Sequence, residues 1–240
     1  MSTEALTLKE TLRSTDKQLS WALLSMSSVA SAKILVDAGY DYIMIDLEHG
    51  SDDPALIDPC FEAIEAGGAF VGVKARSQSA EDLRIAYDFA PSAIYVPGIS
   101  SAAEVEAFIA ILKSFEGSTP RRAASRDAAF VPLLETMSGV EDSLAIAGID
   151  GVDVIAVGPG DLSRDLGIPG DTHNERVKAA YNFMLEASEK TGVAVGVGWP
   201  DTSREQWDAW NARGNRFEFG MIDGLSLRSA AAAAIQQLRG

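Results

Sequence analysis

The chain is poor in cysteine, histidine and positive charge. Its 240 residues include one cysteine, Cys60, and two histidines, His49 and His173. A single cysteine excludes an internal disulfide and favours a reducing compartment, so we expect a cytoplasmic protein. Two histidines so placed exclude a histidine-rich metal site. A net charge of −15 argues against nucleic acid or an anionic membrane as a partner, but leaves anionic small molecules open.

Long apolar runs are also lacking. The first 18 residues have no apolar signal core, and no later run is long enough to span a membrane. With 47% hydrophobic residues, the chain can nevertheless bury a large core. One polar stretch, residues 113–130, interrupts the pattern, and we read it as a loop because strands and helices alternate again directly after it. We therefore expect a single domain over residues 1–240.

Short apolar runs alternate with amphipathic segments along the chain. About eight such strand–helix units fit into 240 residues, which is typical of a (β/α)8 TIM barrel. A short N-terminal helix near residues 5–14 is expected to cover the barrel bottom. The rival fold is an open doubly wound sheet, which needs a glycine-rich phosphate loop that the first strand lacks. The expected strands span residues 20–26, 40–46, 69–75, 92–98, 128–135, 151–160, 193–199 and 216–222.

Three of these strands end in polar residues. The second ends in IDLEHG, which includes Asp46 and His49; the fifth is followed by Glu135, and the sixth by Asp161 after a Gly-Pro-Gly turn. In a parallel barrel these ends meet at the rim that carries the active site. Two carboxylates there can bind a hard divalent cation such as Mg²⁺ or Mn²⁺. The backbone amides of Gly160 and Asp161 can hold a substrate carboxylate.

Each of these residues also has a purely structural interpretation. Glu135 and Asp161 can be helix caps, and the GPG stretch a tight turn. His49 can be an exposed loop residue. Asp46 beside it favours a functional histidine, because a carboxylate fixes the tautomer of an imidazole and raises its basicity, directly or through water. The presence of all four residues at one rim favours the functional interpretation.

The stretches YDYIMIDLEHG, VPLLET and AVGPGDLSRDLGIPG, in this order, resemble the HpcH/HpaI aldolase family, the metal-dependent class II pyruvate aldolases. The likeness runs from about residue 20 to the C-terminus. It implies a TIM barrel that forms homotrimers or homohexamers, with the last helix exchanged between neighbours. It also implies reversible aldol addition of a 2-oxo acid, such as pyruvate or hydroxypyruvate, to an aldehyde through an enolate.

The resemblance assigns roles to four residues. Glu135 and Asp161 match the metal-binding carboxylates, His49 the histidine of the acid/base system, and Asp46 its supporting acid. The implied cofactor is Mg²⁺ or Mn²⁺, with Co²⁺ also open. A bound cation would polarise the keto oxygen and a base would move the proton, so no Schiff-base lysine is needed.

The chain departs from the family pattern after the third strand. The family's arginine, which stabilises enolate charge, falls on Lys74, and Arg76 lies two residues on. A period of two puts both on one face of the strand, so either is a candidate for this catalytic contact. Arg121, Arg122 and Arg126 in the polar stretch are further candidates to compensate, although surface solvation is the favoured reading of these three.

Two other features and two alternatives complete the predictions. Trp199, at the seventh strand end, can line the substrate pocket or pack between barrel and helices. The alanine-rich C-terminal segment suits a close-packed helix at a subunit contact. The alternatives to an aldolase are a citrate-lyase-β-like acyl-CoA lyase or synthase on the same barrel, and a catalytically lapsed binding subunit.

Overall fold

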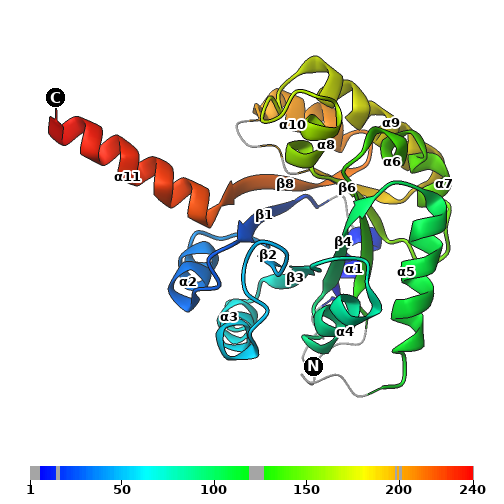
Figure 1. The fold of residues 1–240 in the computed structure, drawn as a ribbon, viewed down its shortest axis with the longest axis horizontal. Coiled ribbons are helices and arrows are strands. Elements are labelled where there is room, and N and C mark those ends of the chain that lie inside the picture. Colours follow the sequence, from blue (N-terminus) through cyan, green and yellow to red (C-terminus); the bar gives the residue numbers. More distant parts are fainter. Residues whose placement is uncertain (1–5, 15–16, 119–126, 198, 200–201, 240) are drawn as a thin grey trace.

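The computed structural model describes residues 6–14, 17–118, 127–197, 199 and 202–239, and Figure 1 shows its fold. Eight parallel strands form a closed barrel in sequence order, β1 to β8, as predicted. An open doubly wound sheet is therefore excluded. The strands are β1 (Leu19–Leu24), β2 (Tyr42–Asp46), β3 (Phe70–Lys74), β4 (Ala93–Ile99), β5 (Ala129–Leu134), β6 (Val154–Val157), β7 (Ala194–Val197) and β8 (Asn215–Ile222).

Helices surround the barrel, and the predicted N-terminal helix is present as α1. Apolar strands form the wall because both of their faces are covered: every residue of β2, β5 and β6 is buried, as expected for parallel strands. The helices are α1 (Leu8–Ser14), α2 (Val29–Asp37), α3 (Pro54–Ala66), α4 (Ala80–Asp88), α5 (Ala102–Ser114), α6 (Met137–Glu141), α7 (Ser143–Ala147), α8 (Pro159–Asp165), α9 (Glu175–Thr191), α10 (Arg204–Asn211) and α11 (Asp223–Arg239).

Local sequence signals explain where several helices begin. Ser79 caps α4 by accepting a hydrogen bond of 3.2 Å from the backbone N–H of Asp82. Pro54 opens α3 after the cap Asp53. One prediction was wrong in detail: the expected Gly-Pro-Gly turn opens the short helix α8. The segment after β5 forms two short helices, α6 and α7.

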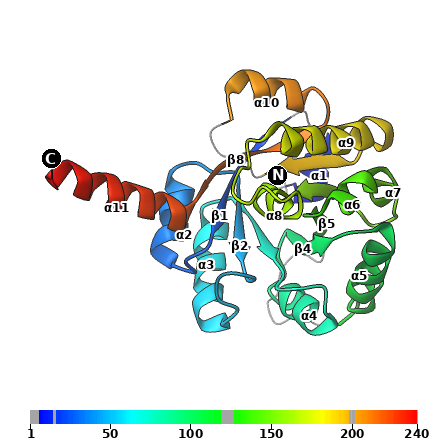
Figure 2. The same ribbon diagram turned by 45° about the horizontal axis from the view of Figure 1, so that its top comes forward.

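The last helix, α11, leaves the barrel and extends away from it, as both ribbon views show (Figures 1 and 2). Only its first residue, Asp223, is buried, and Leu225, Leu227, Ile235 and Leu238 are exposed. The predicted helix is thus present, but within the described chain it is not close-packed. Among the described residues no helix is both long and apolar enough to cross a membrane.

The interior of the barrel is packed with apolar side chains below its upper rim. A small cavity of about 20 Å³ remains there, lined by Trp21, Met44, Tyr95, Leu133, Ala156, Val157, Gly196 and Phe217. This volume is about that of one water molecule. The apolar layer therefore forms a floor beneath the polar strand ends.

Candidate active site

Polar side chains meet at the carboxyl ends of the barrel strands. Asp46 and Lys74 are the last residues of β2 and β3, and Glu135 directly follows β5. Asp161 lies in the first turn of α8, which follows β6. Asp46, Lys74 and Glu135 are all less than 10% exposed, so three charged groups occupy a largely buried layer. Charge in such surroundings needs a partner, because an isolated buried charge is costly.

Glu135 has its two carboxylate oxygens in different environments. Oε2 accepts a hydrogen bond of 2.8 Å from the backbone N–H of Gly98, while Oε1 lies 3.4 Å from Nζ of Lys74. Burial raises the pKa of Glu135, and Lys74 and the Gly98 N–H offset only part of that rise. Thr136, not Glu135, caps the following helix. Glu135 is therefore not the helix cap that the structural interpretation required.

Asp161 contributes the second carboxylate. It is close enough for its charge to contribute to the raised pKa of Glu135. Its own carboxylate pairs with Arg164, one turn further along α8. Gly158 caps this helix, so Asp161 is not the N-cap that the structural alternative required.

The donor set at this rim fits a hard divalent cation that keeps open positions for other ligands. Glu135 and Asp161 offer carboxylate oxygens, which Mg²⁺ and Mn²⁺ prefer. Gly158 leaves the space that Glu135 needs, since a Cβ there would lie 2.7 Å from Oε1. Within the described ranges no group of three or more histidine, cysteine, aspartate or glutamate residues could hold a metal ion. The candidate donors therefore remain the pair that the sequence motifs predicted, Glu135 and Asp161.

Lys74 points into the carboxylate layer. Its Nζ lies 2.5 Å from Oε2 of Glu48 and 3.4 Å from Oε1 of Glu135. Burial lowers the pKa of Lys74, but the charges of Glu135 and Glu48 outweigh that effect and hold the pKa above its ordinary value. The side chain is therefore an ammonium ion, which suits the stabilisation of negative charge better than nucleophilic attack.

Arg76 does not share this position, contrary to the expectation that both residues lie on one face. Strand β3 ends at Lys74, so the alternation of a strand does not continue to Arg76. Its guanidinium pairs with Asp52 at 2.7 Å and Asp82 at 3.7 Å, and its side chain is half exposed. Of the two candidates, Lys74 faces the carboxylates and Arg76 faces the outside of the rim.

The turn that follows β2 is built by Asp46. Its Oδ1 accepts hydrogen bonds from the backbone N–H groups of Glu48 at 2.9 Å and His49 at 3.0 Å. Among the described residues the Asp46 carboxylate contacts the backbone of this turn and not the imidazole, so its action on His49 through water stays a prediction. The carboxylate nearest to the ring is Glu48, whose Oε2 lies 3.6 Å from His49 Nε2. The His49 side chain is 64% exposed, so it reaches the solvent side of the site.

The remaining predicted residues separate into two places. Gly160 lies in the first turn of α8, with open space where a side chain would begin, so its backbone is approachable as predicted. Trp199 is 1% exposed, donates a hydrogen bond of 2.7 Å from Nε1 to the carbonyl of Thr172, and packs against Tyr181 and Trp210. These are the contacts of a packing residue, not of a pocket wall.

Three residues that contribute contacts at this rim were not predicted from the sequence. Glu48 links Lys74 to His49, Gly98 binds Glu135, and Asp165 accepts a hydrogen bond of 2.8 Å from the backbone N–H of Met137. The Asp165 bond ties α8, which carries Asp161, to the start of α6, two residues after Glu135. Glu48 lies within the IDLEHG motif, so the motif could have indicated its role. The roles of Gly98 and Asp165 depend on tertiary contacts that no local motif indicates. Arg121, Arg122 and Arg126 lie outside the described residues.

A closed parallel barrel with charged residues at the carboxyl ends of its strands has the architecture of a TIM-barrel enzyme, a fold whose members carry their active sites at that rim. The family model of the HpcH/HpaI aldolase/citrate lyase family matches residues 20–230. The chain belongs to this family, as its motifs predicted.

Individual relatives extend the comparison. The chain is 28% identical to a hydroxypyruvate/pyruvate aldolase of Paraburkholderia phytofirmans, with both chains fully covered. It is 24% identical to a 4-hydroxy-2-oxo-heptane-1,7-dioate aldolase of Salmonella paratyphi C, over 79% of this chain and 78% of that one. A solved HpcH/HpaI family structure from Burkholderia cenocepacia superimposes with a TM-score of 0.80 at 26% identity, covering 97% and 99% of the two chains.

Proposed function

We propose that the protein is a divalent-metal-dependent aldolase that joins a 2-oxo acid, pyruvate or hydroxypyruvate, to an aldehyde in a reversible reaction. One observation carries this proposal: Glu135 and Asp161 follow the neighbouring strands β5 and β6 at one rim of the barrel, and the ammonium group of Lys74 lies 3.4 Å from Glu135. This arrangement offers two oxygen ligands and one fixed positive charge to an incoming 2-oxo acid. The aldolase names of the relatives support the same substrate class.

Glu135 and Asp161 would hold the cation, which we assign as Mg²⁺ or Mn²⁺, with Co²⁺ as a further possibility. When bound, it would polarise the keto oxygen of the donor as a Lewis acid. The N–H groups of Gly160 and Asp161 lie in the first turn of α8, where intrahelical partners are lacking. We assign them to the donor carboxylate.

The chain's own residues then account for the movement of charge and protons. Lys74 places a positive charge beside the cation-binding carboxylate, where enolate charge develops as the donor loses a proton from C3. His49, exposed at the solvent side, takes that proton and returns one to the aldehyde oxygen during addition. Asp46 shapes the turn that presents His49, since it bonds to the turn's backbone.

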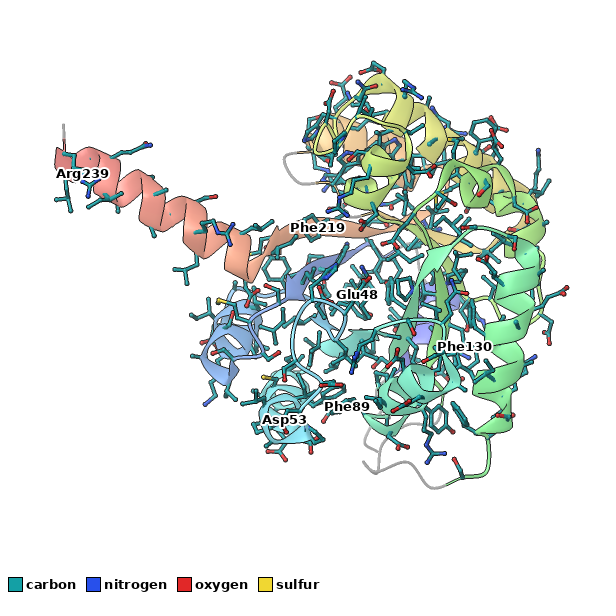
Figure 3. All side chains as sticks on the ribbon, viewed as in Figure 1. Glu48, Asp53, Phe89, Phe130, Phe219 and Arg239 are labelled. Carbon is teal, nitrogen blue, oxygen red and sulfur yellow. The ribbon has the colours of Figure 1, made fainter. Side chains whose placement is uncertain are left out.

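We further propose that the protein works as a homotrimer or homohexamer in the cytoplasm. The exposed apolar residues of α11, namely Leu225, Leu227, Ile235 and Leu238, support assembly with other copies, because a projecting helix with such residues needs cover. Figure 3 shows Arg239 at the far end of this helix. The single cysteine, Cys60, is free and buried, which fits a reducing compartment.

A product assay tests the aldolase assignment. Chelator-treated protein is mixed with pyruvate or hydroxypyruvate and a set of short aldehydes, some with a free carboxylate, and products are identified by mass spectrometry. We expect a new hydroxy-oxo acid that forms only after Mg²⁺ or Mn²⁺ is added. Cleavage of acyl-CoA esters without any aldol product would instead establish the lyase alternative, and no turnover of either kind would favour a lapsed barrel.

A further inference from the structure

The carboxylate layer contains a residue that the proposed roles leave unused, Glu48. It lies in the turn after β2, between Lys74 and His49, and Figure 3 shows it toward the middle of the ring of strands. Its side chain is 27% exposed, while that of Lys74 is 9% exposed. Glu48 thus closes the layer on its solvent side and is the outermost partner of the lysine.

The ammonium group of Lys74 lies closer to the carboxylate of Glu48 than to that of Glu135. Its Nζ is 2.5 Å from Glu48 and 3.4 Å from Glu135, a difference of 0.9 Å in favour of Glu48. A charge-assisted N–H···O bond is normally about 2.7–2.9 Å long, so the contact with Glu135 is longer than a full bond. The ammonium group therefore lies closest to Glu48, as an ion pair, and its hydrogen bond to Oε1 of Glu135 is long.

The difference between the two Lys74 distances matters for Oε1 of Glu135, the oxygen that we assign to the cation. Oε2 is already bonded to the N–H of Gly98, whereas Oε1 faces Lys74 and the Gly158 backbone that leads to Asp161. Across the described part of the chain, Lys74 is the one cation within ion-pair distance of Glu135. If Lys74 moved closer, its ammonium group would occupy Oε1, the oxygen that does not bond to Gly98.

We infer that Glu48 is a positioning residue that holds the Lys74 ammonium group off Glu135, and so keeps Oε1 of Glu135 available to a divalent cation. The inference rests on the proposed cation site and deepens it. The effect of Glu48 depends on the position of its carboxylate relative to Lys74, and not on its negative charge alone. Lys74 remains close enough to stabilise charge on a substrate, because it stays within the same layer.

Glu48→Asp separates position from charge. The variant keeps the carboxylate but shortens its reach by one methylene, so Lys74 is released toward Glu135. Asp52→Asn is the matched control, since Asp52 belongs to the same loop but pairs with Arg76 at 2.7 Å. Mn²⁺ titration by calorimetry is the readout. We expect Glu48→Asp to weaken binding about tenfold, or about 1.4 kcal/mol, and Asp52→Asn to change it less than about threefold.

A double-mutant cycle with Lys74→Met adds a second test. If Glu48 acts through the lysine, Glu48→Gln weakens Mn²⁺ binding in the wild-type background and has little effect once Lys74 is methionine. Equal losses in both backgrounds, or wild-type affinity in Glu48→Asp, would overturn the inference while leaving the cation site standing. Failure of the proposed function looks different: the wild-type protein would show no saturable Mn²⁺ binding, or Glu135→Gln would leave binding unchanged. Thermal unfolding verifies that each variant is folded.

Discussion

Gly158→Ala is the sharpest single perturbation of the proposed cation site. The added methyl group would lie 2.7 Å from Oε1, 3.0 Å from Cγ and 3.3 Å from Cδ of Glu135. Carbon atoms in contact normally lie about 3.5–4.0 Å apart, so the Cγ contact alone requires a displacement of roughly 0.5 Å. Glu135 has little freedom to comply, because it is buried and bonded to Gly98.

The displacement is large on the scale of metal coordination, where ligand distances hold to within about 0.2 Å. We therefore expect Mn²⁺ affinity to fall by about 10–100-fold, the range seen when the support of a metal ligand is removed. This loss corresponds to about 1.4–2.8 kcal/mol of binding free energy. The fold itself should tolerate the change, because Gly158 has φ −97° and ψ 93°, which alanine can adopt.

Gly160→Ala is the matched control, two residues away in the same helix start, where an added methyl group meets nothing within 4 Å. Calorimetric titration with Mn²⁺ should give near wild-type affinity for this variant. Loss of the glycine cap in Gly158→Ala costs up to about 1 kcal/mol, so its melting temperature should fall only about 2–4 °C. Equal affinities for the two variants would refute the placement of the cation at Glu135.

Three further predictions follow from other parts of the structure. First, His49→Ala should slow proton transfer by about 10²–10⁴-fold and keep Mn²⁺ affinity; kinetics and titration check this, and an unchanged rate removes His49 from the mechanism. Second, Asp223→Ala should destabilise the fold near neutral pH by about 2–4 kcal/mol, measured by urea unfolding at several pH values, because Asp223 accepts bonds of 2.7–2.8 Å from Ser25, Ser31 and Gly224. Third, Ile235→Glu, on the exposed side of α11, should reduce the mass measured by light scattering if α11 joins subunits; an unchanged oligomer would exclude that role for Ile235.

The sign of the Asp223 effect with pH follows from its environment. Burial alone would raise the pKa of Asp223, but hydrogen bonds from Ser31 and Ser25 outweigh burial and hold the pKa below its usual value. The stabilisation is therefore present above the pKa of the unfolded chain, near 3.9, and is lost as the pH falls through the lower folded value. The wild-type and Asp223→Ala stabilities should converge in acid. A constant difference down to about pH 2 would contradict this reasoning.

The fold was predictable because each barrel unit is specified locally. Apolar runs of strand length alternate with capped amphipathic helices, and parallel strands must point their carboxyl ends the same way. Glu135 and Asp161 follow β5 and β6, so their meeting at one rim followed from the topology. The caps at Ser79 and Asp53 were likewise local signals.

The side-chain contacts of the turn after β2, the orientation of Arg76 and the direction of α11 depend on tertiary contacts that local sequence patterns do not predict. Asp46, Glu48 and His49 lie within four residues, and only the conformation of the turn decides that Asp46 bonds to the backbone while Glu48 meets the imidazole. Arg76 turns outward because β3 ends before it. The alanine-rich pattern predicts α11 as a helix, but the direction in which α11 leaves the barrel depends on how Asp223 fixes its start.

The most direct test of the central claim is proton exchange on the donor without any aldehyde. Chelator-treated protein is incubated with pyruvate in D₂O, and the methyl signal is followed by NMR before and after Mg²⁺ or Mn²⁺ is added. In the proposed mechanism, enolate formation uses the cation held by Glu135 and Asp161, together with Lys74 and His49. We therefore predict that the methyl signal is lost only when the cation is present, and that Glu135→Gln retains the signal. Retention of the signal with pyruvate, and no exchange at C3 of hydroxypyruvate, would contradict the assignment of this rim as an enolate-forming site.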